Sequence, residues 1–395
     1  MTEANLPSKG PPSRQARSEF RALLLPFAGN GFQAGVYTVL VADLAGALRL
    51  GPGALGLALA TLAAAAIPSV AVAGRIAERS GRRVVLVSGA AAAGLFFLLL
   101  AVVGSYPALL GAMVLGGLAF GFFDMSPDSL GGDFERQYGE NVMNRLHVGH
   151  NGAATLGSFL SGVALWAGLG YRWIYVGVGM LLLVLALVSL RLPLPARLPE
   201  PETSTQGPGR RSTVSWLAGG VVLAVVLVGF ETLTGAALEG YSSIYLRDVL
   251  VSSPLVAGMG IAAYQLARLL GQAGSAATID TIGERGVLAI AGAGVAVGIC
   301  TLVVTGSPIV GATGLLLVGL FSAPVRPISA SIAGRAAPGR VGHAMAAVWG
   351  AFYVSSLAGP LLVGALADAF TLRVALAVFI PTSLLIAALA WWKVR

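Results

Sequence analysis

The residues of this chain that could carry chemistry are ionisable side chains placed inside long apolar segments. Asp124 and Asp128 lie four residues apart in the apolar stretch 107–130, so on a helix they share one face. His147 and His150 open the next apolar stretch, and histidine titrates near neutral pH. Two close carboxylates in a medium of low dielectric need not both be ionised, and such a pair can couple to protons. Alternatively, Asp128 caps its helix and the histidines lie in a wet interface.

Two arginines, Arg268 and Arg326, also fall inside apolar stretches. Arg326 is flanked by two prolines, which predict a broken helix there. It is also the mate of Asp124 in the internal repeat described below, so we expect the two charges at equivalent depth, where they could pair. The alternative is an arginine whose long side chain reaches the membrane interface. Arg268 lies at mid-depth, where that explanation is harder to sustain. Its candidate partners are Asp124, Glu231 or a substrate anion.

Further candidates are polar or aromatic residues within the apolar stretches. A polar face in the first stretch would serve ligand binding or hydrogen bonds between helices equally well. Glu231, near mid-depth, joins Asp124 and Asp128 as a proton-coupling candidate, whereas Glu239 is expected near the end of its stretch. Phe120 and Phe123 could stack on a ligand or simply pack. The substrate-binding candidates are Asn30, Gln33, Tyr37, Asn151, Gln265, Arg268, Arg326, Trp349 and Tyr353.

Composition places the chain among membrane proteins. Hydrophobic residues make up 56%, charged residues 11%, and the mean hydropathy is +0.83, whereas a soluble domain has about 25% charged residues. The net charge of +8 comes from residues in short loops between apolar stretches, so membrane topology explains it and no nucleic-acid partner is expected. A single cysteine, Cys300, excludes a disulfide framework.

Several chemistries are missing from the sequence. It contains no phosphate-binding GxxxxGK[ST] loop, so ATP is not the expected energy source. No nucleophile–base set and no second cluster with metal-ligand spacing stands out. We therefore expect a protein that is not an enzyme, that holds no metal or cofactor, and that draws energy from a proton gradient.

Twelve apolar stretches, each near the ~20 residues that cross a bilayer, predict an all-α integral membrane protein. They are 21–46, 54–76, 84–104, 107–130, 143–168, 171–191, 215–239, 254–279, 286–305, 308–330, 342–367 and 371–392. The polar stretch 193–213 is a predicted cytoplasmic linker. We therefore divide the chain into a cytoplasmic tail 1–19, a bundle 20–192, the linker, and a bundle 214–395. Lys and Arg gather in alternate loops, which predicts that both termini are cytoplasmic in an inner membrane.

An internal repeat relates the two predicted bundles. A shift of 202 positions aligns landmarks of the first half with the second without gaps. Such a parallel repeat of two six-span halves is one way in which transporters are built. The matched residues include Pro52 with Pro254, Gly56 with Gly258, Glu78 with Asp280, Gly81 with Gly283, Arg83 with Arg285, and Gly162 with Gly364.

The segment Gly74–Arg83 reads GRIAERSGRR and resembles the major facilitator superfamily signature G-x-x-x-D-x-x-G-R-R/K. Glu78 stands where the family usually has Asp, and a reduced copy lies around Asp280. The resemblance covers nearly the whole chain. It implies two pseudo-symmetric six-helix bundles, alternating access around a central cavity, and a monomer in the lipid bilayer. It also implies a gating latch on the cytoplasmic side, unless these arginines only set topology; the latch residues would be Gly74, Glu78, Gly81, Arg82, Arg83 and Asp280.

Within that superfamily, the segments Met143–His147 and Tyr241–Arg247 are similar to the fucose-symporter-type and related bacterial branches. The leading hypothesis is a proton-coupled symporter of a small polar solute such as a sugar. The alternative is proton-driven export of hydrophobic or cationic drugs, although Gly157-Ser158 lacks the Gly-Pro of many such exporters. A membrane sensor or scaffold without transport is a third possibility.

Overall fold

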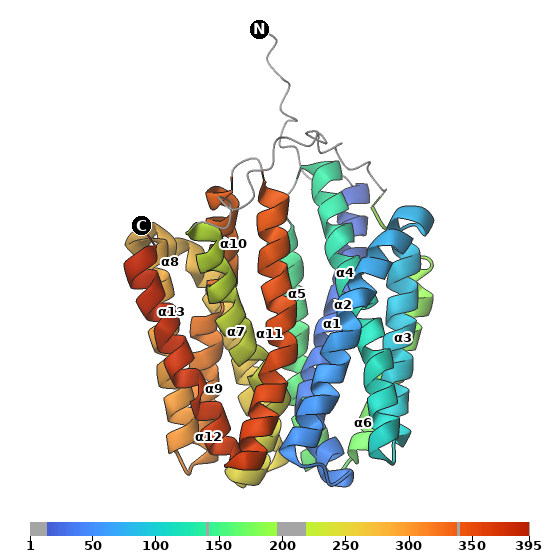
Figure 1. Cartoon of the computed structure of the whole chain (residues 1–395). Coiled ribbons are helices and arrows are strands. Elements are labelled where there is room, and N and C mark those ends of the chain that lie inside the picture. The colour runs from blue at the N-terminus through green and yellow to red at the C-terminus, as the bar shows by residue number, and fades with distance from the viewer. Residues whose placement is uncertain (1–13, 140–141, 196–218, 338–339, 395) are drawn as a thin grey trace.

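The computed structural model describes residues 14–139, 142–195, 219–337 and 340–394 (Figure 1). Within these ranges the chain is helical and contains no strand, as the sequence predicts. The linker 193–213 lies mostly outside the described residues, so its boundaries stay a prediction. The helices are α1 (Arg14–Ala47), α2 (Pro52–Ser80), α3 (Arg82–Val102), α4 (Tyr106–Tyr138), α5 (Met143–Trp166), α6 (Tyr171–Ser189), α7 (Gly220–Ile244), η2 (Tyr245–Val249), α8 (Pro254–Val304), α9 (Pro308–Ser322), α10 (Val325–Ala336), α11 (Val341–Ala369), α12 (Leu372–Ala377) and α13 (Phe379–Lys393).

In the described ranges these helices make the twelve expected passes. The helix α8 holds two passes that meet at Gly283, where the backbone is non-helical, while α9–α10 and α12–α13 each form one pass. Nine passes are long and apolar enough to cross a membrane. The other three, α1, α5 and the first part of α8, carry polar candidates such as Asn30, His150 and Arg268. Polar candidates therefore concentrate in the passes with the weakest apolar signal.

Two local irregularities shape the second bundle. The tenth pass is broken between Ser322 and Val325, as its prolines predict, and Arg326 lies in the first turn after the break. The seventh pass continues beyond its predicted end at 239, because the π-helix η2 extends α7 to Val249. Short π-helical segments are frequent at functional sites. The extension moves Glu239 away from the end of the pass.

The internal repeat is visible in the backbone. Gly81, which ends α2, has φ +92°, and its repeat mate Gly283 has φ +72°. These left-handed values favour glycine, because a side chain would be strained there. Both copies of the signature thus turn the chain with the same unusual conformation.

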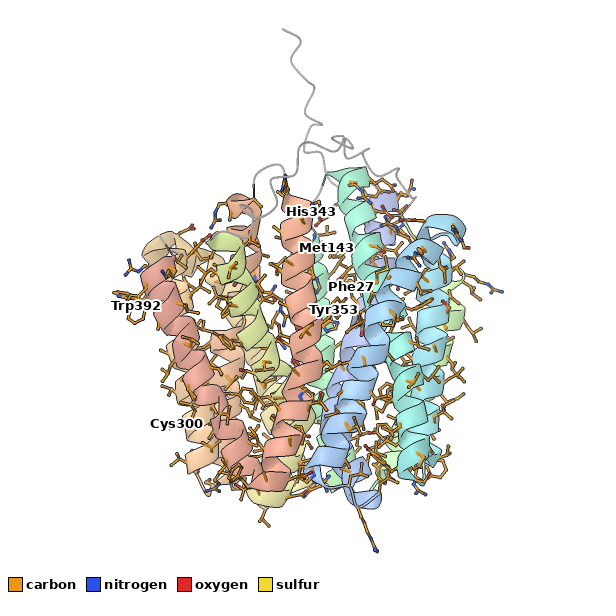
Figure 2. All side chains as sticks on the ribbon, in the orientation of Figure 1. Phe27, Met143, Cys300, His343, Tyr353 and Trp392 are labelled. Carbon is orange, nitrogen blue, oxygen red and sulfur yellow. The ribbon has the colours of Figure 1, made fainter. Side chains whose placement is uncertain are left out.

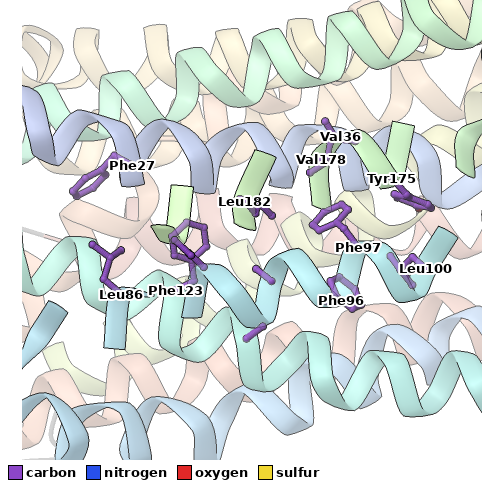
Figure 3. Close-up of a cluster of buried hydrophobic side chains, with 14 of the residues drawn as sticks. Phe27, Val36, Leu86, Phe96, Phe97, Leu100, Phe123, Tyr175, Val178 and Leu182 are labelled. Atoms are coloured by element: carbon purple, nitrogen blue, oxygen red, sulfur yellow. The ribbon is translucent and has the colours of Figure 1, made fainter. Parts of the chain in front are cut away.

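Each bundle has its own apolar core. In the first bundle, Phe96, Phe97, Phe123, Tyr175 and Leu182 are fully buried where α3, α4 and α6 meet (Figure 3). Of the two alternatives for Phe123, stacking on a ligand or packing, the structure therefore shows packing in the core. The core fixes α4, the helix that carries the two candidate aspartates.

Among the described residues, the close backbone contacts between the two bundles lie on one side. We call the side where α1 begins and α13 ends the terminal face, and the other side the opposite face (Figure 1). Toward the opposite face, Gly56 of α2 meets Gly364 of α11, and Gly162 of α5 meets Gly258 of α8. A Cβ atom on Gly162 would lie 2.9 Å from Cα of Gly258. Small residues allow membrane helices to approach in this way.

Polar contacts reinforce this closure. Arg247 of η2 forms an ion pair with Asp43 of α1, and the hydroxyl of Ser243 donates to the carbonyl of Val39 at 2.7 Å. The phenol of Tyr241 donates to the carbonyl of Pro52 at 2.7 Å. The opposite face is therefore closed by backbone packing, hydrogen bonds and a charge pair.

Toward the terminal face, charged and aromatic side chains inside the passes stay accessible. Asp124 and Asp128 of α4 are exposed, Arg326 of α10 keeps 33% side-chain exposure, and Trp349 of α11 is 49% exposed. We call the accessible space that these residues line the central cavity. The structure thus has the bundles joined at the opposite face and apart toward the terminal face.

Replacing Gly162 by leucine tests this arrangement. Because the new side chain would collide with the backbone of α8, we expect Gly162→Leu to separate the bundles at the opposite face by a few ångströms. The measurement is the distance between spin labels on Leu169→Cys and Val251→Cys, in a protein where Cys300 is replaced by serine.

The matched control is Gly111→Leu in α4, because a Cβ at Gly111 meets nothing within 4 Å. We expect the control to leave the spin-label distance unchanged. An unchanged distance in Gly162→Leu would contradict the closing role of the glycine contact.

Candidate functional site

On the first bundle, Asp124 is held by a chain of amides from α1. The amide nitrogen of Asn30 donates to Oδ1 of Asp124 at 2.6 Å, and Gln33 donates to Oδ1 of Asn30 at 3.1 Å. Gln33 is fully buried and Asn30 nearly so. The predicted polar face of α1 is therefore used, at least in part, to position a carboxylate.

Asp128 lies one turn further toward the terminal face, beside a histidine. Nε2 of His147 is 3.7 Å from Oδ1 of Asp128, with both side chains well exposed. The ring of His147 also meets Phe27 edge-on at 5.4 Å, and the ring of His150 is 6.4 Å away. The structure thus brings both sequence-predicted ionisable pairs into one group where α4 and α5 face the cavity.

On the second bundle, Glu231 and Arg326 form a close ion pair. Nη2 of Arg326 lies 3.2 and 3.1 Å from the two carboxylate oxygens of Glu231, and the guanidinium lies 4.8 Å from the centre of the Phe352 ring. In this structure Arg326 therefore pairs with Glu231 and not with Asp124. Glu231, on the neighbouring α7, satisfies the arginine within its own bundle.

A second ion pair lies beside the first. Nη1 of Arg268 is 2.9 Å from Oε1 of Glu239, and the guanidinium lies 5.7 Å from the centre of the Tyr264 ring. The ion-pair partner is thus neither Asp124 nor Glu231, the two carboxylates expected from the sequence. Glu239 was expected near the end of its pass, whereas α7 continues to Ile244 and η2 to Val249, so Glu239 lies well inside the pass and pairs with Arg268 of α8. Sequence reasoning therefore missed Glu239 as a site residue.

The remaining candidates divide between packing and the cavity. Tyr37 contacts the sulfur of Met113 at 3.7 Å and the rings of Phe96 and Phe120, so it packs inside the first bundle. Trp349, Phe352 and Tyr353 form a run of edge-to-face rings on α11. Gln265 is buried and Asn151 half-buried.

Tyr353 lies on the side of α11 that faces the first bundle (Figure 2). Asp124 and Asp128 of the first bundle and Arg326 of the second are also accessible toward the terminal face. The two bundles thus both contribute polar side chains to the region between them.

The gating residues form contacts that the signature alone did not predict. Arg82 pairs at 2.7 Å with Asp133, a fully buried residue of α4 that sequence reasoning missed. Arg83 donates to the carbonyls of Ser189 and Leu192 at the end of α6. Glu78 and Asp280 are exposed, and Gly74 lies in the last turns of α2. The contacts of these two arginines thus join helices within the first bundle.

The repeat mates of Arg82 and Asp133 have exchanged charges. They are Glu284 and Arg335, which also form an ion pair, between α8 and the end of α10. Among the described residues, no group of three or more His, Cys, Asp or Glu is placed to hold a metal ion. The chemistry available at the site is therefore that of carboxylates, guanidinium groups, amides and aromatic rings.

Comparison with known proteins agrees with this architecture. Residues 23–250 and 221–395 match the family model described as Major Facilitator Superfamily. An uncharacterised transporter of Sinorhizobium fredii is 23% identical over 95% of this chain and 98% of its own length. An uncharacterised MFS-type transporter of Yersinia pestis is 29% identical over 38% of this chain and 40% of its own length.

Two solved structures share the fold. A mutant of the nucleoside transporter NupG has a TM-score of 0.76 at 13% identity, over 95% of this chain and 100% of its own. A bacterial homologue of the human lysosomal transporter Spinster, inward-facing and unoccupied, has a TM-score of 0.75 at 15% identity, over 97% of both chains. At these identities the likeness concerns the fold alone.

The Glu231–Arg326 pair can be tested by a double-mutant cycle. Glu231→Gln leaves a partly buried arginine without its counter-charge, and Arg326→Gln leaves a buried carboxylate, so each change is expected to lower the melting temperature by about 2 °C or more. The double variant removes both charges and is expected to melt above the additive value.

Thermal unfolding in detergent measures the cycle. The exposed pair Glu284–Arg335 provides the matched control, because an exposed ion pair contributes little. Additive effects at Glu231 and Arg326 would show that the two residues do not stabilise each other.

Proposed function

The chain belongs to the Major Facilitator Superfamily, and we propose that it is a secondary active transporter that couples a small polar organic solute to proton movement. The proposed cycle is alternating access, in which the bundles rock around the central cavity. Support comes from the contacts of α5 with α8 and of α2 with α11, which close the opposite face. The cavity then opens toward the terminal face.

The observation that carries proton coupling is the pair of carboxylates on α4. Asp124 and Asp128 lie inside a membrane pass and are exposed, yet no Lys or Arg of the described ranges forms an ion pair with either. An uncompensated charge at membrane depth is costly, and such residues commonly mark proton relays. Protonation during part of the cycle would remove that cost, so these two residues are the proposed proton carriers.

Glu231 is a third proposed proton site, and its protonation would act on a neighbouring arginine. Its carboxylate holds Arg326, so a proton on Glu231 would weaken the pair and free the guanidinium. The amides of Asn30, Gln33, Asn151 and Gln265 are the proposed hydrogen-bonding groups for the solute, with Arg268 and Arg326 beside them. Trp349 and Tyr353 would pack against its body. Tyr37 is a weaker candidate, because its ring packs within the first bundle.

The proposed setting follows from the loop charges. The terminal face bears most of the Lys and Arg residues and is proposed to be cytoplasmic, in an inner membrane. The gating set around Glu78, Arg82 and Asp280 then lies on the cytoplasmic side. We propose a monomer whose partners are the solute and the bilayer, with the proton gradient as energy source and no cofactor, metal, nucleic acid or catalysed reaction.

Export of hydrophobic or cationic compounds is the second candidate function. The observation that favours it is the aromatic run on α11, in which Trp349 is half-exposed and Tyr353 lies within range of two carboxylates. A hydrophobic cation would suit such a surface. Import and export differ in the direction of proton movement, and that difference can be measured.

Proton flux in proteoliposomes tests the proposed function. With a pH dye inside, pools of sugars, organic anions and amines are added in turn. We expect one pool to drive protons inward with the natural protein, and Asp124→Asn to reduce that flux at least about tenfold because it removes an essential proton-carrying or binding carboxylate.

The control variant is Asp248→Asn, an exposed aspartate of η2 outside the cavity, which is expected to retain the flux. Outward proton movement driven by hydrophobic cations would favour the exporter. Equal proton flux in the natural protein and in Asp124→Asn would exclude Asp124 from the coupling path.

A further inference from the structure

The charges that border the central cavity do not balance. The second bundle contributes two arginines, Arg268 and Arg326, and each is bonded to its own glutamate at 2.9–3.2 Å. The first bundle contributes Asp124 and Asp128, with only an amide and a histidine as polar partners among the described residues. When both aspartates are ionised, the cavity carries an excess of negative charge.

This distribution argues against an anionic solute. A carboxylate or phosphate entering the cavity would have to compete with Glu231 and Glu239 for guanidinium groups that are already engaged. It would also approach two uncompensated aspartates, and like charges at low dielectric repel strongly. The positive charges of Arg268 and Arg326 are therefore compensated by Glu239 and Glu231, and little positive charge is left to bind an anionic ligand.

A second observation, independent of the carboxylates, points to a hydrogen-bond donor. Oε1 of Gln33 is buried and accepts no hydrogen bond in the described part of the chain. Gln33 is joined to Asp124 through Asn30 and lies on the same polar face of α1. A buried amide oxygen without a donor is costly, so the hydrogen-bonded chain that holds Asp124 contains an unused acceptor behind the carboxylate.

We propose that the transported solute carries a positive charge, as an ammonium or similar N–H-bearing group, and that Asp124 is its counter-ion. This inference rests on the proposed transport function and names its substrate class. Asn30 engages Oδ1 of Asp124 and leaves Oδ2 without a partner in the described residues. The ammonium binds there, and a proton on Asp128, beside His147, neutralises the second carboxylate.

The aromatic residues fit the same ligand. Tyr353 lies on the side of α11 that faces the first bundle (Figure 2), and Phe352 stacks under the guanidinium of Arg326 at 4.8 Å. Aromatic faces attract cations and pack against apolar carbon. A cationic solute would thus lie between the carboxylates of α4 and the rings of α11, which are parts of different bundles.

Charged thiol reagents test the cavity without any knowledge of the solute. Cysteine is placed in the cavity as Tyr353→Cys or Trp349→Cys, in a protein with Cys300→Ser because that native thiol is exposed. The probes are the trimethylammonium-ethyl and sulfonato-ethyl methanethiosulfonates. The rate at which each reagent modifies the protein cysteine is divided by its rate with the free thiol 2-mercaptoethanol, which corrects for intrinsic reactivity. We expect the cationic probe to be favoured by about tenfold or more, as in clefts that focus one sign of charge.

Two controls make the result specific. Val341→Cys, at the exposed start of the same helix, is expected to show little preference between the probes. Asp124→Asn with Asp128→Asn is expected to reduce the preference at position 353 to the level of that control. Equal rates, a preference for the anionic probe, or failure of the cationic probe to reach both cavity thiols would overturn the proposal.

The proteoliposome experiment with pools of solutes distinguishes failure of the cationic-solute inference from failure of the proposed transport function. If the amine pool moves protons, both stand. If sugars or organic anions move protons through an Asp124-dependent path, the chain is a proton-coupled transporter and the inference of a cationic solute is wrong. If no pool moves protons while the cysteines still prefer the cationic probe, the proton-coupled function fails and the cation-selective cavity remains.

Discussion

The close approach of backbones at two glycine pairs is the constraint on which the rest of the structure depends. Gly56 with Gly364 and Gly162 with Gly258 bring helices of different bundles together at the opposite face. In a membrane, where apolar surface gains little from contact with other apolar surface, packing of this kind supplies much of the attraction between helices. Because the bundles meet there, the charged side chains toward the terminal face remain accessible.

Charge is the second constraint, and the two bundles satisfy it differently. The second bundle neutralises its arginines internally, through Glu231 and Glu239. The first bundle pairs Arg82 with Asp133 near its terminal face but leaves Asp124 with an amide. The arginines of the second bundle are thus compensated by glutamates, whereas Asp124 of the first bundle has no counter-charge within the described residues and could bind a proton or a cationic ligand.

The sequence predicted the architecture well because membranes restrict it. Apolar length, the repeat of 202 positions and the signature around Gly81 were enough to predict twelve passes. The glycine contacts follow the same repeat, because Gly56 and Gly162 each contact the repeat mate of the other. The partners of the charged residues could not be predicted, because pairing depends on helix rotation. Asp124 and Arg326 are repeat mates, yet each has its polar partner within its own bundle: Asp124 an amide, and Arg326 a carboxylate. Glu239 was misplaced because nothing in the sequence marked the π-helical extension of α7.

The two halves of the repeat use equivalent positions unequally. If Asp124 and Arg326 were bonded to each other, the total charge around the cavity would be the same, but the carboxylate without a counter-charge would be the buried Glu231 instead of Asp124. With Arg326 held by Glu231, the charge of Asp124 must be met by something that enters from outside. In the proposed transport cycle, the occupant of the cavity would set how costly it is for the bundles to close over α4, and binding would be linked to conformation through that cost.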